Sequence, residues 1–305
     1  MITGGKVIKV RAENVKEAKR ENMSALDRNQ GAEREVVGIL PAGGRAKRIA
    51  PLPCSKELYP IGFRSVNESQ SLRPKVAAHY LLEKLRLAGI TKAYIVLRKG
   101  KWDIPAYFED GAILNMDLAY LIMRLPFGVP FTLDRAYPFV QNAMVAFGFP
   151  DILFQPDDAF VQLLSRQKAT SADVVLGLFS ANSSQKADMI DLNEDGRVRQ
   201  VIIKPPQTDL RYTWNIAVWA PVFTHFMHEF LASVGIEDKP TETEADRWEL
   251  SLGQVIQAAI DNLLVVDSVI LPNESYLDIG TPEDLAKAVR NGGPESISSR
   301  LREKP

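Results

Sequence analysis

The clearest chemical signal in the sequence is a glycine-containing loop that follows a short apolar run. Residues 36–40 have the aliphatic, β-branched composition of a buried strand, and they lead into Ala42, Gly43 and Gly44. A glycine-rich turn after such a strand exposes backbone N–H groups to an anion. The same loop carries four basic side chains, which are Arg45, Lys47, Arg48 and Lys56. The loop therefore predicts a site for a nucleoside di- or triphosphate, with a solvated surface loop as the open alternative.

Two common phosphate-binding motifs are missing from this loop. The dinucleotide fingerprint G-x-G-x-x-G does not occur here. If a Walker A motif is counted from Gly38, its lysine position holds Gly44. The loop therefore favours neither a dinucleotide oxidoreductase nor a P-loop nucleotidase.

The composition narrows the class of protein. The chain has 305 residues, 37 basic and 38 acidic side chains, a net charge of −1, three His and one Cys. A single cysteine, Cys54, excludes an intrachain disulfide and a thiolate zinc cluster. The balanced charge does not favour nucleic-acid binding, and no apolar stretch approaches the roughly 18 residues of a membrane span. We expect a globular cytoplasmic protein with neither nucleic acid nor membrane as a partner.

Apolar runs alternate with helical patterns along most of the chain. The strand-like runs are 36–40, 93–97, 143–149 and 173–178, and helical spacing covers 74–87 and 131–141. Two further runs, 189–192 and 198–203, flank a turn and predict a hairpin. Strand, helix and strand in this order predict an α/β fold with helices on both faces of a largely parallel sheet.

The two ends of the chain differ from this central part. Residues 11–34 are rich in charge and poor in large apolar groups, and the segment after Arg290 is polar. Such segments bury too little apolar surface to offset the entropy of ordering. We therefore expect a charged extension at 1–34, a folded domain at 35–290 and a polar tail at 291–305.

The loop resembles the signature of the sugar-1-phosphate nucleotidyltransferases. The similar segments are LPAGGRAKRIAP at 40–51 and SKELYPI at 55–61, and the most similar subgroup is the glucose-1-phosphate thymidylyltransferases and bacterial uridylyltransferases. The resemblance implies a Rossmann-like, mixed and mostly parallel sheet of the nucleotide-diphospho-sugar transferase type. It implies that Arg48 grips the triphosphate and that Lys56 stabilises charge at the α-phosphate. The nucleotide-binding positions that it implies are Ala42, Gly43, Gly44, Arg45, Lys47, Gly128 and Phe131.

The resemblance continues over about residues 35–290. FGFPDILF at 147–154 and YLDIGTP at 276–282 are similar to the family segments that supply two Mg²⁺ carboxylates, here Asp151 and Asp278. VIIKP at 201–205 and WEL at 248–250 are similar to the sugar-phosphate segments. The sugar-side residues that the resemblance implies are Lys204, Glu249 and Asn215.

The implied reaction is attack of a sugar 1-phosphate on the α-phosphorus of a nucleoside triphosphate, dTTP or UTP by resemblance, with release of pyrophosphate. Both reactants are anions, so charge neutralisation and positioning are the main tasks, and Mg²⁺ is the implied cofactor. The family also implies assembly of identical chains. A nucleotide-binding protein without turnover and a transferase that uses a nucleotide sugar as donor are the alternatives.

Several positions depart from the family pattern or allow a purely structural interpretation. Ala46 and Lys47 replace a Gly-Thr pair, Phe131 replaces a base-reading glutamine, and Ile203 replaces an acid. Taken alone, Asp151 could cap a turn and Asp278 could merely precede a helix that begins at Thr281 and Pro282. His225 and His228, three residues apart on a predicted helix, favour a packing or surface role over metal binding.

Overall fold

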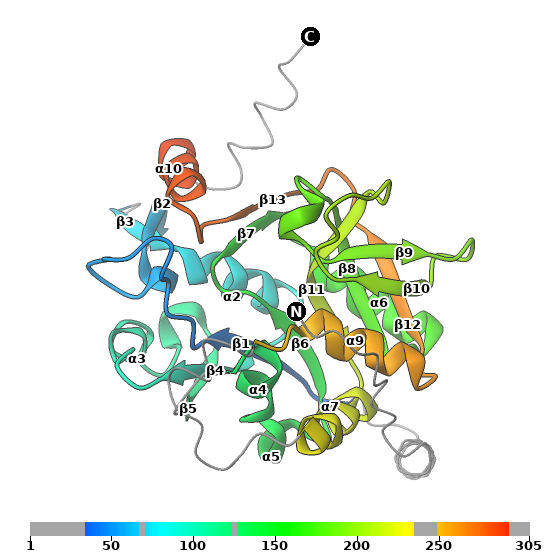
Figure 1. Cartoon of the computed structure of the whole chain (residues 1–305). Coiled ribbons are helices and arrows are strands. Elements are labelled where there is room, and N and C mark those ends of the chain that lie inside the picture. Colours follow the sequence, from blue (N-terminus) through cyan, green and yellow to red (C-terminus); the bar gives the residue numbers. More distant parts are fainter. Residues whose placement is uncertain (1–33, 67–70, 124–126, 235–248, 293–305) are drawn as a thin grey trace.

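The computed structural model describes residues 34–66, 71–123, 127–234 and 249–292. These residues form a nine-stranded mixed sheet with the order β10-β9-β11-β6-β1-β4-β5, and β8 and β12 extend it beyond β11 (Figure 1). The strands are β1 (Val36–Ala42), β4 (Lys92–Arg98), β5 (Asp117–Met123), β6 (Met144–Gly148), β8 (Val174–Ser180), β9 (Met189–Leu192), β10 (Val198–Ile202), β11 (Tyr212–Trp219) and β12 (Val266–Ile270).

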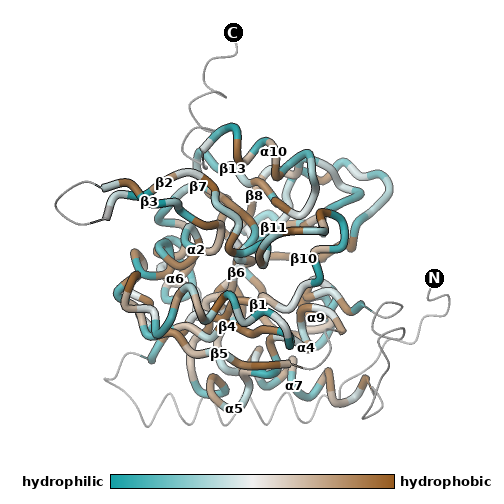
Figure 2. Tube along the Cα trace, turned by 90° about the vertical axis from the view of Figure 1, so that its left-hand side faces the viewer, coloured by the Kyte–Doolittle hydropathy of each residue, from teal (hydrophilic) through white to brown (hydrophobic). Residues whose placement is uncertain are grey.

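Two short antiparallel pairs complete the strands. β2 (Pro60–Val66) pairs with β3 (Ser71–Val76), and this hairpin projects from one side of the molecule (Figure 2). β7 (Ile152–Gln155) pairs with β13 (Ser275–Asp278). The second pair joins a segment from the middle of the chain to one near its end.

The strand directions confirm the predicted fold class. β1 runs parallel to β4 and β6, β4 runs parallel to β5, and β8 runs parallel to β12. β11 is antiparallel to β6 and β8, which makes the sheet mixed. Because parallel strands end at one edge, the residues that follow β1, β4 and β6 collect there.

Helices cover both faces of the sheet, as the alternating pattern predicts. On one face lie α4 (Val129–Asp134), α5 (Tyr137–Val140), α7 (Pro221–Val234) and α9 (Leu252–Asp261). On the other lie α2 (Ala77–Leu87), α3 (Asp103–Phe108) and α6 (Ala159–Thr170). Val37 and Ile39 of β1 enter the first core, whereas Leu40 and Ala42 enter the second, as the period of two in a strand requires.

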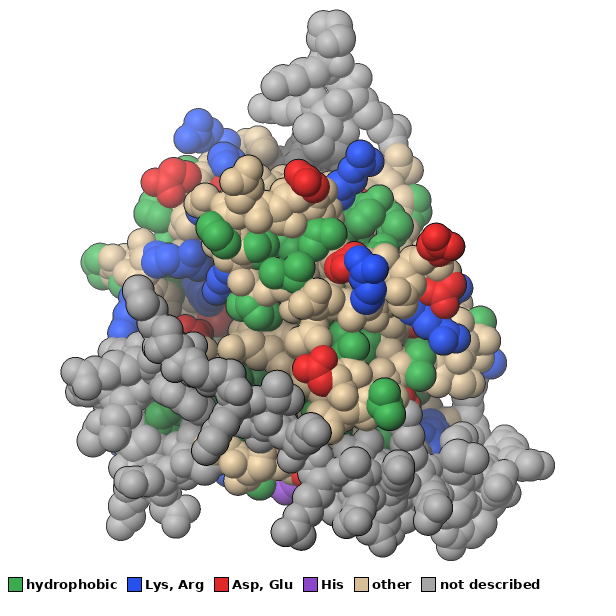
Figure 3. Space-filling view, turned by 45° about the vertical axis from the view of Figure 1, so that its right-hand side comes forward, with side chains coloured by type: hydrophobic (Ala, Val, Ile, Leu, Met, Phe, Trp, Pro, Cys, Tyr) green, Lys and Arg blue, Asp and Glu red, His purple; other side chains and the backbone are tan. Residues whose placement is uncertain are grey.

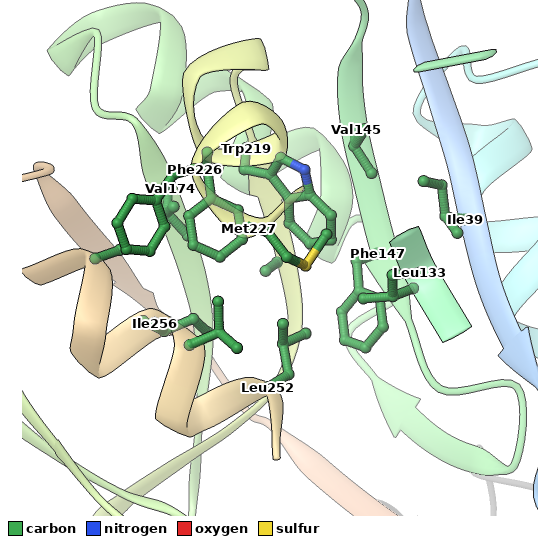
Figure 4. Close-up of a cluster of buried hydrophobic side chains, with 14 of the residues drawn as sticks. Ile39, Leu133, Val145, Phe147, Val174, Trp219, Phe226, Met227, Leu252 and Ile256 are labelled. Carbon is green, nitrogen blue, oxygen red and sulfur yellow. The ribbon is translucent and has the colours of Figure 1, made fainter. Parts of the chain in front are cut away.

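The core on the α7 side is rich in aromatic side chains (Figure 4). Trp219 and Phe226 pack with Met227, and Leu252 and Ile256 approach them from α9. The remaining elements are α10 (Pro282–Asn291) and the short 3₁₀ turns η1 (Lys56–Leu58), η2 (Ala112–Leu114) and η3 (Ser184–Lys186). α10 belongs to a smaller core with β2 and β13 through Ala288, Ile61 and Ile279.

Some predicted boundaries were wrong. The helix predicted from residue 74 begins at Ala77, because Pro74 belongs to β3 and pairs with Phe63. The helix predicted at 131–141 is split into α4 and α5, with Pro138 at the start of α5, where the missing N–H costs nothing. The predicted hairpin is confirmed as β9 and β10.

The two predicted terminal segments are almost entirely outside the part of the chain that the structure describes. The extension at 1–34, except Arg34, and the tail from 293 lie outside the described residues. None of the described helices is long and apolar enough to cross a membrane. On the face in Figure 3, Lys and Arg side chains are interspersed with Asp and Glu.

A buried histidine makes the stability of this fold sensitive to acid. The side chain of His79 is fully buried in α2, packs against Tyr107 and Phe108, and accepts a hydrogen bond at Nδ1 from the Val76 N–H. Burial, with the charges of Arg64 and Lys75, lowers its pKa from 6.5 to about 3. Below pH 6.5 the unfolded chain therefore binds the proton that the folded chain excludes, and stability falls.

We predict that the free energy of unfolding falls by about 2 kcal/mol through His79 alone between pH 7 and pH 5. His79→Gln should remove this part of the pH dependence in urea unfolding curves. His228→Gln, at a side chain that is 42% exposed, is the matched control and should retain it. An unchanged pH dependence in His79→Gln would contradict the prediction.

Candidate functional site

The ladder between β7 and β13 brings together two carboxylates that are far apart in the sequence. Asp278 is in register with Ile152, the residue after Asp151. The Ile279 N–H donates to the backbone oxygen of Asp151 at 3.1 Å. Both carboxylates therefore lie just beyond the carboxyl end of β6. The position of Asp278 is fixed by backbone pairing rather than only by the capped helix that follows, although Thr281 does cap α10.

Lys56 joins the loop after β1 to these carboxylates. It begins the 3₁₀ turn η1, and its Nζ donates to Oδ2 of Asp151. The two side chains are 16% and 11% exposed, so the contact is largely shielded from water. An ion pair at this depth is screened far less than a surface pair. The predicted phosphate lysine and the predicted metal carboxylate thus meet in the structure.

Arg48 forms a long ion pair with the second carboxylate, Asp278. Its guanidinium is 3.8 Å from Oδ2 of Asp278, with 65% of the Arg48 side chain exposed. The Gly280 N–H donates to the other oxygen, Oδ1, of Asp278 at 2.8 Å and helps to fix the carboxylate. A long, exposed ion pair contributes little to stability, so Arg48 can turn toward an incoming anion at small cost.

The charges of this cluster act on one another. Burial, followed by the charge of Asp151, raises the pKa of Asp278, while Gly280, Lys56 and Arg48 oppose the shift. Burial works to lower the pKa of Lys56, but the carboxylates of Asp151 and Glu57 outweigh it and the pKa is raised. Two carboxylates and two cations therefore form one electrostatic unit, in which the charge of Asp151 and burial make Asp278 harder to ionise.

The loop backbone shows how Ala46 is accommodated where the family pattern has glycine. Ala46 has φ of 53°, in the left-handed region, so a residue with a Cβ occupies the conformation that glycine adopts freely. This costs roughly 1–2 kcal/mol. The N–H groups of Ile49 and Ala50 both donate to the Ala46 oxygen at 3.0 Å and hold the turn. Gly44 lies against the Lys56 side chain, since a Cβ on Gly44 would be 3.7 Å from Nζ.

The predicted base-side residues gather at the start of α4. Gly128 bridges Leu250, and the Leu250 N–H donates to the Phe127 oxygen at 3.3 Å. Glu249 is the exposed residue just before this bridge. Phe131 is half-buried and packs edge-on against Phe127. The bridge therefore brings two segments predicted for the site, around 128–131 and 249–250, into contact.

Two of the three predicted sugar-side residues lie at β10 and β11, and the third, Glu249, lies beside the Gly128 bridge. Lys204 follows β10, is exposed and has φ of 41°. Asn215 is buried at a bulge of β11, and its Nδ2 has no hydrogen-bond partner among the described residues. Asp188, which sequence reasoning missed, is close enough to Lys204 for that cation to oppose the rise in its pKa that burial causes.

Sequence reasoning also missed a set of contacts on both sides of Lys56. Ser55 and Glu57 bind Asp103 and Lys101, which lie between β4 and the start of α3. The available signal was that β4 is parallel to β1, which places residues after β4 at the same edge as the loop. Residue types alone did not indicate which polar side chains would be buried there.

The two carboxylates suit a divalent cation that takes ligands from both the protein and a substrate. No cluster of three or more His, Cys, Asp or Glu side chains in the described ranges is arranged to hold a metal. Mg²⁺ uses oxygen ligands and commonly takes one or two carboxylates together with substrate phosphates. Asp151 and Asp278 supply that donor chemistry, beside cations suited to phosphate. In the histidine pair, Nδ1 of His225 contacts the Tyr137 hydroxyl and Nδ1 of His228 contacts the Asp134 carboxylate.

Comparison with known families identifies the fold and its class. A family model described as nucleotidyl transferase matches residues 37–292. The chain belongs to the nucleotidyl transferase family. It is 25% identical over 259 residues to a glucose-1-phosphate thymidylyltransferase of Streptomyces antibioticus and 23% identical over 264 residues to one of Streptomyces griseus. Each match covers 84% of this chain but 65% of the relative, slightly less than two thirds of its length.

Solved structures agree with this family fold. The inositol-1-phosphate CTP transferase of T. maritima has a TM-score of 0.63 and 18% identity, over 89% of this chain and 98% of that one. A UDP-glucose pyrophosphorylase complexed with UDP-glucose has a TM-score of 0.65 and 15% identity, over 88% and 100%. At these identities the likeness supports the fold of the family member rather than its substrate.

The bridge at Gly128 offers a test of the site's framework. Gly128 has φ of +105°, and a Cβ there would lie 2.1 Å from the Leu250 oxygen. We predict that Gly128→Ala lowers the free energy of unfolding by roughly 2–4 kcal/mol, because backbone strain and a clash with backbone add. Urea unfolding measures this loss.

Gly196→Ala is the matched control. Gly196 has φ of +85°, but a Cβ there would have nothing within 4 Å, so only the cost of roughly 1 kcal/mol for the left-handed backbone applies. Equal losses in the two variants would show that the bridge to Leu250 does not constrain the site.

Proposed function

We propose that this family member transfers a nucleoside monophosphate from a nucleoside triphosphate to a sugar 1-phosphate and releases pyrophosphate. The observation that carries the proposal is the convergence of Lys56, Asp151 and Asp278 from three distant segments, with Arg48 beside them. Cations and a carboxylate pair at the carboxyl edge of the sheet can neutralise and position two anionic substrates.

The two cations have separate tasks in this proposal. Arg48 is exposed and can fork onto two phosphate oxygens of the triphosphate. Lys56 is nearly buried and provides a point charge where negative charge develops on the α-phosphate. The Lys56 ammonium exchanges part of its contact with Asp151 for the substrate. The sugar phosphate is already ionised, so the reaction needs no covalent nucleophile or general base.

Asp151 and Asp278 would hold Mg²⁺ in this proposal. When bound, the cation neutralises charge on the phosphates and helps to orient them. The strand pairing that brings the two carboxylates together supports this role, because two close carboxylates favour a cation between them. Arg48 and Lys56 would keep the phosphates next to these carboxylates.

The substrate pocket is proposed from the residues around the bridge and from the relatives. The Streptomyces relatives are thymidylyltransferases, and dTTP or UTP is the proposed nucleotide. Phe131 offers a face for stacking on a base, although it cannot read the base edge as an amide would. Lys204 would bind the sugar phosphate, and Glu249 and Asn215 would contact sugar hydroxyls. Ala42, Gly43, Gly44, Arg45 and Lys47 would line the phosphate path.

Turnover with a substrate panel tests the proposal. Each common nucleoside triphosphate is incubated with Mg²⁺ and a set of sugar 1-phosphates, and pyrophosphate is measured. We predict release with at least one pair, and a loss of at least about 100-fold in Asp151→Asn, because a carboxylate that holds the metal is removed.

Asp117→Asn is the control for that variant. Asp117 is exposed at the amino end of β5, the opposite edge from the site, so its turnover should remain within twofold. If nucleotide binds by calorimetry but no pair releases pyrophosphate, the protein binds without transfer. Release of nucleoside diphosphate from a nucleotide sugar would favour the donor-using alternative.

A further inference from the structure

The residues on both sides of Lys56 are tied to one short segment after β4. The Ser55 N–H donates to Oδ2 of Asp103 at 2.6 Å, and the Ser55 hydroxyl donates to Oδ1 of the same carboxylate at 2.8 Å. The Lys101 ammonium donates to both oxygens of the Glu57 carboxylate at 2.7 Å. One residue before and one after Lys56 are therefore fixed by partners two positions apart, a set that we call the clamp (Ser55, Glu57, Lys101 and Asp103).

The ion pair of the clamp is buried, whereas Ser55 and Asp103 are half-buried. The side chains of Glu57 and Lys101 are 2% and 5% exposed. A buried ion pair commonly contributes no more stability than apolar residues of the same size, because both charges must be desolvated. Its distinctive property is directional, since two hydrogen bonds to one carboxylate fix the orientation of η1.

Backbone hydrogen bonds couple the orientation of Ser55 and Glu57 to that of Lys56. The Leu58 N–H donates to the Ser55 oxygen at 2.8 Å, and the Tyr59 N–H donates to the Lys56 oxygen at 3.1 Å. These bonds form a single tight turn that has Lys56 at its start. Clamping Ser55 and Glu57 therefore leaves the Lys56 side chain directed toward Asp151.

We propose that Lys101 and Asp103 are positioning residues that hold the Lys56 ammonium against Asp151 and the reacting phosphates. The inference rests on the proposed function, in which Lys56 acts on the α-phosphate. It assigns a positioning purpose to the segment 101–103, which is hydrogen-bonded to the residues on both sides of Lys56. Breaking the clamp should act on turnover mainly through Lys56.

The main experiment is a double-mutant cycle on the full chain. Glu57→Met with Lys101→Met removes both buried charges together, so neither remains unpaired. We expect turnover to fall at least tenfold in the wild-type background. In the Lys56→Met background the same pair should change the residual turnover by less than twofold, because the group on which it acts is gone. If the clamp pair lowers turnover by the same factor in both backgrounds, the proposal is overturned.

A remote ion pair controls for a general loss of stability. Arg166 and Asp267 join α6 to β12 through two bonds of 2.9 and 3.0 Å, and Asp267 is 1% exposed. Arg166→Met with Asp267→Asn should lower the unfolding midpoint but keep turnover within twofold. A loss of turnover as large as that of the clamp variant would contradict a positioning role. If the double clamp variant does not fold, Asp103→Asn, at a half-buried site, tests the same point through Ser55.

A binding measurement separates this inference from the proposed function. Calorimetry with inorganic triphosphate, which includes a phosphate in the α position, is expected to show weaker binding in the clamp variant than in the wild type, and no further weakening when Lys56→Met is added. Unchanged triphosphate affinity in the clamp variant would overturn the positioning role of Lys101 and Asp103. A wild-type protein that binds triphosphate more tightly than the clamp variant but shows no turnover would overturn only the proposed function.

Discussion

The antiparallel pairing of β7 with β13 is the constraint on which the site depends. It sets Asp278 opposite Ile152 and so places it beside Asp151, although more than a hundred residues separate them in the sequence. The pKa of Asp278 is raised there, first by burial and then by the charge of Asp151. Lys56 and Arg48 oppose that rise, and both of these cations of the first loop lie beside the two carboxylates.

The parallel strands of the main sheet bring the other groups of the site to the same edge. Parallel pairing of β1 with β4 and β6 makes three connections leave the sheet at one edge. The connection after β1 carries Arg48 and Lys56, the one after β4 carries Lys101 and Asp103, and the one after β6 carries Asp151. Each contributes different groups: an exposed arginine with a nearly buried lysine, a supporting ion pair and hydrogen bonds, and a carboxylate. The helices on both faces bury the sheet and keep these connections in register.

Much of this arrangement could be predicted from the sequence, and the missing parts have physical reasons. Alternating runs predicted the α/β sheet, and the similarity of short segments predicted that Arg48, Lys56, Asp151 and Asp278 share a site. Local patterns do not encode long-range pairing, so the β7–β13 ladder and the Glu57–Lys101 ion pair were not foreseen. Helical spacing at 74–87 concealed the end of β3, because Pro74 and Lys75 fit either period until pairing with β2 decides. The domain limits and the role of the charged extension stay predictions.

The fate of the α-phosphate is the most direct test of the central claim that these groups transfer a nucleotide. The protein is incubated with Mg²⁺ and with dTTP or UTP labelled on the α-phosphorus. Each sugar 1-phosphate of a set that includes glucose 1-phosphate is added in turn, and the products are separated. We predict that the label passes into a nucleotide sugar while unlabelled pyrophosphate is released in equal amount. Label that stays in the triphosphate with every sugar 1-phosphate, or that leaves as free nucleoside diphosphate, would contradict the account.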